Sequence, residues 1–320
     1  MISVSSELSL HDYLLNLVKE GNATAILKFL SHDFPQLTPA VRDEYTTPSA
    51  LSSSFSLPSR LLLAIVEADA PDVFMIIWDS FYAPHAVDKP RPPSNSHERH
   101  PYGDERVQIP WECLKRSAVN GSIELASAFI KCEPTALARA PPYSIHPEGR
   151  LGSLIISALR YRRFEYVDYI LAQGVDINHE WPRVSVLRTA LSFEQEDSEA
   201  VFMLFWLLKR RVRIQGTGAL RLMVQFELIE GVRALLDSGA DVDDVEEIKL
   251  PLPGRNLPEP ENNSALMEAV KAGNLSMVQL LLDRGAQVGW QNAKGDTPLK
   301  LAETSGLHEI LVLLKERQTT

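Results

Sequence analysis

The chain has 320 residues, of which 45% are hydrophobic and 23% charged, so it is neither disordered throughout nor a bundle of membrane helices. Its formal net charge of −10 has the wrong sign for a protein that coats nucleic acid or an anionic membrane. The only two cysteines, Cys113 and Cys132, exclude a disulfide framework and fit a reducing compartment.

A helical unit recurs along the chain. Each unit begins with a short apolar helix that carries an anchor residue. In chain order, the anchors of the eight units are Leu14, Leu62, Leu114, Ile155, Leu187, Leu220, Leu266 and Leu299. The anchors at 155, 187 and 220 are 32 and 33 residues apart. A period of this length predicts a solenoid in which each helix pair stacks on the next.

Glycines mark the turns and ends of the predicted helices. Asn120–Gly121 and Gly273–Asn274 stand between the two helices of their units, where a tight turn needs a positive φ. Gly239 follows a second helix in the manner of a left-handed C-terminal cap. Arg211 occupies the same position in the preceding unit, so we expect that unit to end differently or under strain.

Proline-bearing polar stretches interrupt the repeats. Eight units of about 33 residues leave about 56 residues for insertions. We place the insertions at residues 31–58, 83–110, 133–150 and 246–260. A solenoid tolerates them because each unit contacts only its neighbours and loops project outward. The units are irregular over residues 8–150 and clearer over 151–315, and we expect one domain over residues 1–320.

The clearer units carry the motifs of one repeat family. Gly295–Leu299 reads Gly-Asp-Thr-Pro-Leu, Gly239–Asp243 reads Gly-Ala-Asp-Val-Asp, and Gly174–Asn178 reads Gly-Val-Asp-Ile-Asn. These segments resemble the ankyrin repeat. The resemblance implies an all-α solenoid of helix-turn-helix units, in which hairpins and inner helices line a concave surface that binds partners. The histidine that the family usually places after the anchor leucine is absent from every unit, which predicts less regular hairpins.

Positive charge is concentrated in one part of the chain. The segment Arg150–Arg221 has eleven basic and eight acidic residues, so its net charge is +3 within a chain of −10. Arginine and aromatic residues are the side chains most enriched in interfaces. The predicted partner-binding residues, on hairpins and inner helices, are Arg150, Arg160, Tyr161, Trp181, Arg183, Arg188, Phe193, Arg221, Phe226 and Trp290.

These features predict a non-enzymatic scaffold or adaptor that binds another protein. The partner would have an acidic patch and an apolar anchor. We expect a monomer of the cytoplasm, with the nucleus as a second candidate compartment. No partner among nucleic acids or membranes is expected, because the net charge is acidic and the longest apolar run, Val201–Leu208, is far shorter than the roughly 20 residues that span a bilayer.

Two other functions remain open from the sequence. The protein could be an accessory protein or enzyme of a small-molecule biosynthetic pathway, with its site in the groove; this rests on family analogy. Leu57–Ile65 is also similar to the opening of an F-box, which would indicate a ubiquitin-ligase adaptor. The same residues fit the first helix of the second repeat.

The sequence motifs that could indicate phosphate or metal binding are incomplete. Gly216–Leu220 contains two glycines but lacks the third glycine or the Lys-Ser/Thr of a phosphate loop. His97 and His100 form a single pair of possible ligands, whereas a structural zinc site needs four. Asp241–Glu246 lacks the glycine of a calcium loop. We therefore expect no catalytic residue, cofactor or metal.

Overall fold

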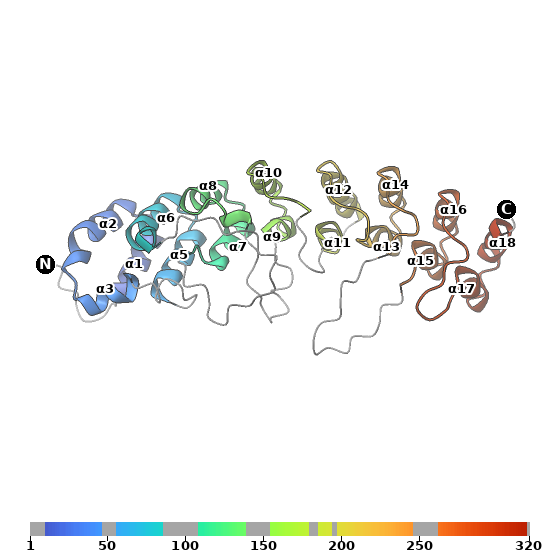
Figure 1. Ribbon diagram of the computed structural model, residues 1–320, viewed down its shortest axis with the longest axis horizontal. Helices are drawn as coiled ribbons and strands as arrows, with labels where there is room; N and C mark the ends of the chain where they lie inside the picture. The colour runs from blue at the N-terminus through green and yellow to red at the C-terminus, as the bar shows by residue number, and fades with distance from the viewer. Residues whose placement is uncertain are drawn as a thin grey trace. The chain divides into compact units, whose positions relative to one another are not determined.

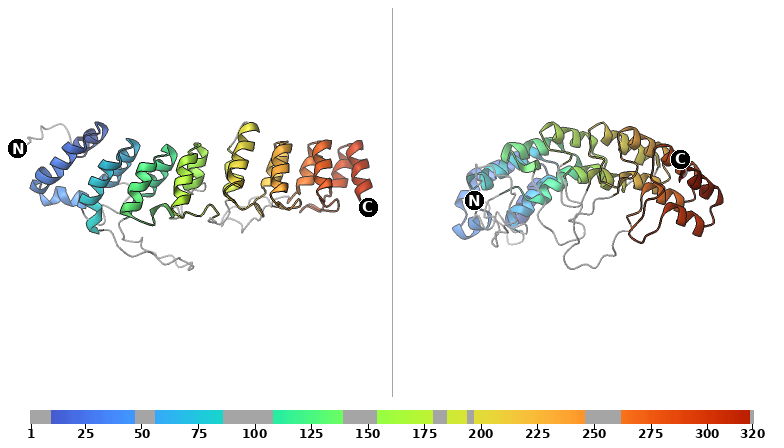
Figure 2. Two further views of the ribbon diagram at one scale, coloured as in Figure 1. Left: turned by 90° about the horizontal axis from the view of Figure 1, so that it is seen from above. Right: turned by 45° about the vertical axis from the view of Figure 1, so that its right-hand side comes forward.

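The computed structural model describes residues 10–46, 56–85, 108–138, 154–178, 185–193, 197–245 and 262–318. These residues form seventeen α-helices, with short 3-10 and π-helical turns and no strand, which confirms the all-α repeat architecture. The chain makes two compact units, Met1–Asp176 and Ile177–Thr320. The helices of each unit form two rows (Figure 1), and successive pairs stand side by side (Figure 2).

In the first unit, the first helices of the pairs contact one another in the order α1, α5, α7, α9, and the second helices in the order α2, α6, α8, α10. The helices of this unit are α1 (Leu10–Lys19), α2 (Ala23–Lys28), α3 (Pro39–Thr46), α5 (Leu57–Glu67), α6 (Pro71–Ile77), α7 (Trp111–Asn120), α8 (Ile123–Cys132), α9 (Leu154–Arg160) and α10 (Phe164–Ala172).

The second unit repeats this arrangement. Its first helices, α11, α13, α15 and α17, contact in that order, α12 contacts α14, and α16 contacts α18. Their bounds are α11 (Val186–Leu191), α12 (Asp197–Leu208), α13 (Ala219–Gln225), α14 (Ile229–Asp237), α15 (Ala265–Lys271), α16 (Leu275–Asp283), α17 (Pro298–Thr304) and α18 (His308–Gln318). In each unit we call the first helices of the pairs the first-helix row, and their partners the second-helix row.

The anchor residues form the core of the first-helix row. All except Leu299 are buried, and Leu62, Leu114, Leu187 and Leu266 expose no measurable surface. Three residues after the anchor a small side chain is buried between neighbouring helices, as at Ala158, Ala269 and Ala302. Serine or threonine side chains cap several of these short helices; Ser264 Oγ, for example, accepts the N–H of Met267 at 3.4 Å.

Part of the first predicted insertion is not an outward loop. Residues 29–46 form a π-helical turn, a 3-10 turn and α3, and they pack against the second repeat. The ring centroids of Phe34 and Phe81 are 5.0 Å apart, and those of Tyr45 and Phe81 are 5.8 Å apart. Burial of these aromatic rings drives the segment onto the solenoid, because each ring removes a large apolar area from water.

The other insertions are described only in part. Residues 136–138 of the third form a 3-10 turn in which Ala136 and Leu137 are buried. Residues 86–107, 139–150 and 246–260 lie outside the described residues.

The strained unit end predicted at Arg211 is present. Arg211 has a φ of 56°, whereas Gly174, Gly239 and Gly285 have φ values near 90° at the equivalent position of their own units. The left-handed conformation places the Cβ of a non-glycine residue close to the following carbonyl oxygen. Arg211 therefore carries a local conformational cost that its neighbours avoid.

Replacing this arginine should stabilise the second unit. We expect Arg211→Gly to raise the free energy of unfolding by about 0.5–1 kcal/mol, since it removes a cost of about 1–2 kcal/mol and glycine returns part of that through the unfolded chain. Gly239→Ala is the matched control and should lower it by about 1 kcal/mol. Urea unfolding followed by circular dichroism measures both, and an unchanged or lower midpoint for Arg211→Gly would contradict the assigned strain.

Candidate interaction surface

Aromatic residues recur at one position of three consecutive repeats. Tyr161, Phe193 and Phe226 each stand six residues after the anchor of their unit. All three lie in the turn that joins the first helix to the second, at the end of the pair opposite the hairpins. Tyr161 is 51% exposed and Phe226 36%, while Phe193 is partly buried. The sequence placed these residues among hairpins and inner helices; the structure puts them at the helix ends.

Cations stand beside this aromatic position. Arg160 is the last residue of α9, is exposed, and directly precedes Tyr161. In the second unit the equivalent position, five residues after the anchor, is Lys271, the exposed last residue of α15. The sequence prediction missed Lys271, although its spacing from Leu266 matches that of Arg160 from Ile155.

Arg188 and Arg221 lie earlier in the first helices, one residue after their anchors. The N–H of Arg188 bonds to Ser185 Oγ at 3.3 Å, which caps α11. Arg221 Nη1 lies 3.9 Å from Glu268 Oε1 on α15, and both side chains are mostly buried. Arg221 therefore joins two neighbouring repeats, and only part of its charge is directed to solvent.

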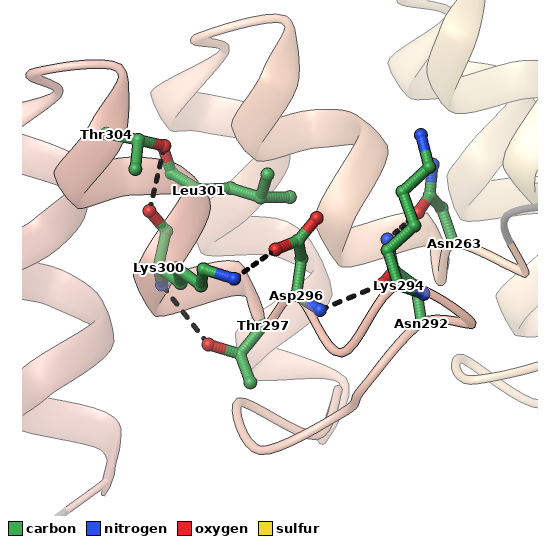
Figure 3. Close-up of polar contacts among 8 residues, drawn as sticks. All are labelled: Asn263, Asn292, Lys294, Asp296, Thr297, Lys300, Leu301 and Thr304. Carbon is green, nitrogen blue, oxygen red and sulfur yellow. Dashed lines mark hydrogen bonds and ion pairs between the residues drawn. The ribbon is translucent and has the colours of Figure 1, made fainter.

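The hairpin before α17 is held by a buried amide (Figure 3). Asn292 Oδ1 accepts the backbone N–H groups of Lys294 and Asp296, both at 2.9 Å. Its Nδ2 donates to Asn263 Oδ1 at 2.9 Å, and both asparagines are buried. Lys300 Nζ pairs with Asp296 Oδ1 at 2.5 Å across the first turn of α17. The hairpin is thus fixed to α17 and to the preceding repeat.

The same network reaches back by another repeat. Asn263 Nδ2 donates to Glu268 Oε1 at 3.0 Å, and Glu268 in turn lies opposite Arg221. Trp290, also on the hairpin, is partly buried and donates its Nε1–H to the carbonyl of Asn262 at 3.2 Å. Hydrogen bonds and one ion pair therefore connect α13, α15 and α17 along the side that carries the hairpins.

A second bond recurs between adjacent repeat tails. Asn178 Oδ1 accepts the N–H of Arg213 at 2.6 Å. Gln215, at the equivalent position one tail later, accepts the N–H of Asp241 through Oε1 at 3.2 Å. Asp243, one tail further on, accepts the N–H of Gln287 through both carboxylate oxygens at 3.2 Å. Burial raises the pKa of Asp243, and the bond from Gln287 opposes that shift. Each tail is in this way tied to the next, which limits the motion of the hairpins.

The predicted site residues therefore have different environments. Arg160, Tyr161 and Phe226 are exposed, whereas Arg188, Phe193, Arg221 and Trp290 are partly buried. Arg150, Trp181 and Arg183 lie outside the described residues. Besides Lys271, the sequence prediction missed Asn263 and Asn292, because a buried amide pair 29 residues apart leaves no local pattern.

A family model for three copies of the ankyrin repeat matches residues 220–319, which cover α13 to α18. Residues 220–319 are therefore ankyrin repeats. No curated protein matches the chain in sequence. The matched ankyrin repeats include Arg221, Phe226, Lys271, Trp290 and the hairpin network. Before residue 220, the helix pairs continue the same stack within each unit.

The segment that resembles the opening of an F-box is part of the helical stack of the first unit. Leu57–Ile65 lies within α5, which packs between α1 and α7 in the first-helix row. Leu61, Leu62 and Ile65 are fully buried there. Within the described residues, no helix combines the length and apolarity needed to cross a membrane.

Neither cysteine has the lowered pKa of a nucleophilic thiol. Burial raises the pKa of Cys113 far above its usual range. Burial also raises the pKa of Cys132 to about 12, and its Sγ lies 3.5 Å from Met75 Sδ. A nucleophilic cysteine needs the opposite shift, from a cation or a histidine. Among the described residues no group of three or more His, Cys, Asp or Glu side chains could hold a metal ion; His97 and His100 fall outside them.

The pKa of Cys132 predicts slow alkylation. A shift from 9.0 to about 12 lowers the thiolate fraction at pH 8 by about a thousandfold, since each pKa unit is a factor of ten. Iodoacetamide should therefore modify Cys132 about a thousand times more slowly in the folded protein than in urea, as followed by peptide mass spectrometry. Equal rates in the two states would show that the thiol is accessible and ionised in the fold.

The buried amide predicts a large loss of stability. Asn292→Ala removes the acceptor of two backbone N–H groups and leaves Asn263 without that bond, so we expect a loss of roughly 1–3 kcal/mol. Lys300→Ala deletes an exposed ion pair of the same hairpin and should cost less than about 1 kcal/mol. Thermal unfolding separates the two, and equal losses would contradict the role given to Asn292.

Proposed function

We propose that this protein is a non-enzymatic scaffold that binds another protein on its first-helix row and hairpins. Ankyrin repeats generally mediate protein–protein interaction. The observation that carries the proposal is an exposed position that recurs at the helix turns of both units, so that each unit has its own binding surface. Tyr161 and Phe226 expose large aromatic surfaces at the same point of their repeats, and a cation precedes that point at Arg160 and at Lys271.

The hairpins of the second unit form a rigid part of the proposed surface. The bonds from Asn292 and Asp243 fix the hairpins to neighbouring repeats before any partner arrives. A surface that is already ordered before binding loses little conformational entropy, so more of the contact energy is available as affinity. Aromatic and arginine side chains are the common centres of such interfaces.

The chemistry of this surface indicates the partner. The exposed cations Arg160 and Lys271 favour carboxylates, and the exposed rings favour a large apolar side chain. We therefore propose a partner with an acidic patch around an apolar anchor, bound to a monomer in the cytoplasm or the nucleus. The acidic net charge argues against nucleic acid and membrane partners.

Two sets of variants test the surface. Tyr161→Ala with Phe226→Ala removes the rings, and Arg160→Glu with Lys271→Glu reverses the charges. We expect each pair to weaken partner binding by tenfold or more, because loss of an interface centre costs above about 1 kcal/mol. Binding is measured by affinity capture from the native cell with quantitative mass spectrometry, followed by titration of the purified partner.

Lys131→Glu with Arg233→Glu is the matched control, since both residues are exposed on the second-helix row and the charge change is identical. This control should retain the partner, and circular dichroism of all variants should be unchanged. Full retention of the partner by both test pairs would refute the proposed surface.

A further inference from the structure

Helix α12 differs from its neighbours on the side that faces away from the first-helix row. Phe202 and Phe205 of α12 stand nine and six residues before Arg211, which occupies the capping position held by Gly174, Gly239 and Gly285 in other repeats. The two phenylalanines are 54% and 53% exposed. The equivalent pairs in the other capped repeats are all polar: Glu165 and Asp168 in α10, Glu230 and Arg233 in α14, and Ser276 and Gln279 in α16.

The two phenylalanines lie outside the buried side of α12. Met203, Leu204 and Leu207 form the buried side of α12 and are at most 1% exposed. Phe202 and Phe205 are three residues apart on the opposite side, so they share one surface one turn apart. An ordinary surface helix has polar residues there. Two adjacent half-exposed rings at positions that are polar in the repeats on either side point to a binding role.

The same helix ends in a basic cluster. Lys209, Arg211 and Arg213 are exposed within five residues. Lys209 follows Phe205 by one turn, and the equivalent residues of α14 and α16 are Asp237 and Asp283. Arg210 instead packs against its own helix. Its guanidinium lies 3.3 Å from the centroid of the Trp206 ring, and its Nη1 donates to the carbonyl of Trp206 at 2.9 Å.

We infer that the α12 patch, defined as Phe202, Phe205 and Lys209, binds a short protein segment that carries a large apolar side chain beside acidic residues. The two rings contact the apolar side chain, and Lys209, Arg211 and Arg213 bind the carboxylates. This site is independent of the first-helix row. The scaffold therefore has two separate surfaces for partners.

The area and the charge of the α12 patch indicate which kind of partner binds there. Two half-exposed phenylalanines offer roughly 200 Å² of apolar surface, whereas a stable dimer needs about 800 Å² from each partner. A short segment matches that area better than a second copy of the chain. An anionic membrane is disfavoured because a flat surface would also meet the exposed acids Glu230 and Asp237 of the neighbouring α14, whereas a short segment can contact the α12 patch alone.

The variant Phe202→Glu with Phe205→Arg tests the patch, because it installs the residues that α14 already has at these positions. It should keep the circular dichroism spectrum and the melting temperature, or raise the latter. A phage-displayed library of random 16-residue peptides is selected on the wild-type protein after depletion on this variant. We expect enrichment of peptides in which Asp or Glu flank Leu, Phe or Trp.

The strongest synthetic peptide should bind the Phe202→Glu/Phe205→Arg variant at least tenfold more weakly and Lys209→Glu several-fold more weakly. It should bind Arg160→Glu/Lys271→Glu as it binds the wild type, which separates this site from the first-helix row. Selection of no peptide, or of peptides without acidic residues, would overturn the inference.

Two further assays address the other occupants. Vesicles of phosphatidylcholine and phosphatidylserine at 4:1 should not sediment the protein, and sedimentation velocity should show no dimer that the phenylalanine variant abolishes. A vesicle or dimer signal lost in that variant would assign the patch to a membrane or to a second copy of the chain instead.

Discussion

Burial of one anchor residue per repeat between neighbouring helices is the constraint on which the rest of the structure depends. The first helices have only six to eleven residues, and such helices are marginal alone in water. Each becomes stable because its anchor, as at Leu114 or Leu266, loses all exposed surface against the helices on either side. The small residue three positions later allows that close approach. Every repeat therefore depends on its neighbours.

This constraint occupies only a few positions of each repeat and leaves the others free to vary. Position six after the anchor and the outer side of the second helix take no part in the core. Tyr161, Phe226, Phe202 and Phe205 occupy such positions, where the repeat does not require a large aromatic side chain. The two surfaces lie on different helix rows, so one can change without altering the other.

Polar side chains fix the backbone path of the hairpins. The helices set where a hairpin begins, but its path is fixed by Asn292 and Asp243, whose side chains satisfy backbone N–H groups of the hairpin and the next tail. Arg221 and Glu268 extend this connection across α13 and α15. A binding surface made from several repeats needs such connections, because each repeat contributes only a few contacts.

The sequence by itself determined the repeat, its helix pairs, the caps and even the strain at Arg211, because each depends on residues within one period of about 33 positions. It could not show that residues 29–46 fold onto the second repeat, since Phe34 and Tyr45 meet Phe81 only through the tertiary structure. Nor could it separate exposed from buried residues within Val201–Leu208, which is apolar throughout. Only the packing of α12 decided that Leu204 and Leu207 lie in the core while Phe202 and Phe205 face solvent, because an apolar helix can bury only the side that meets its neighbours.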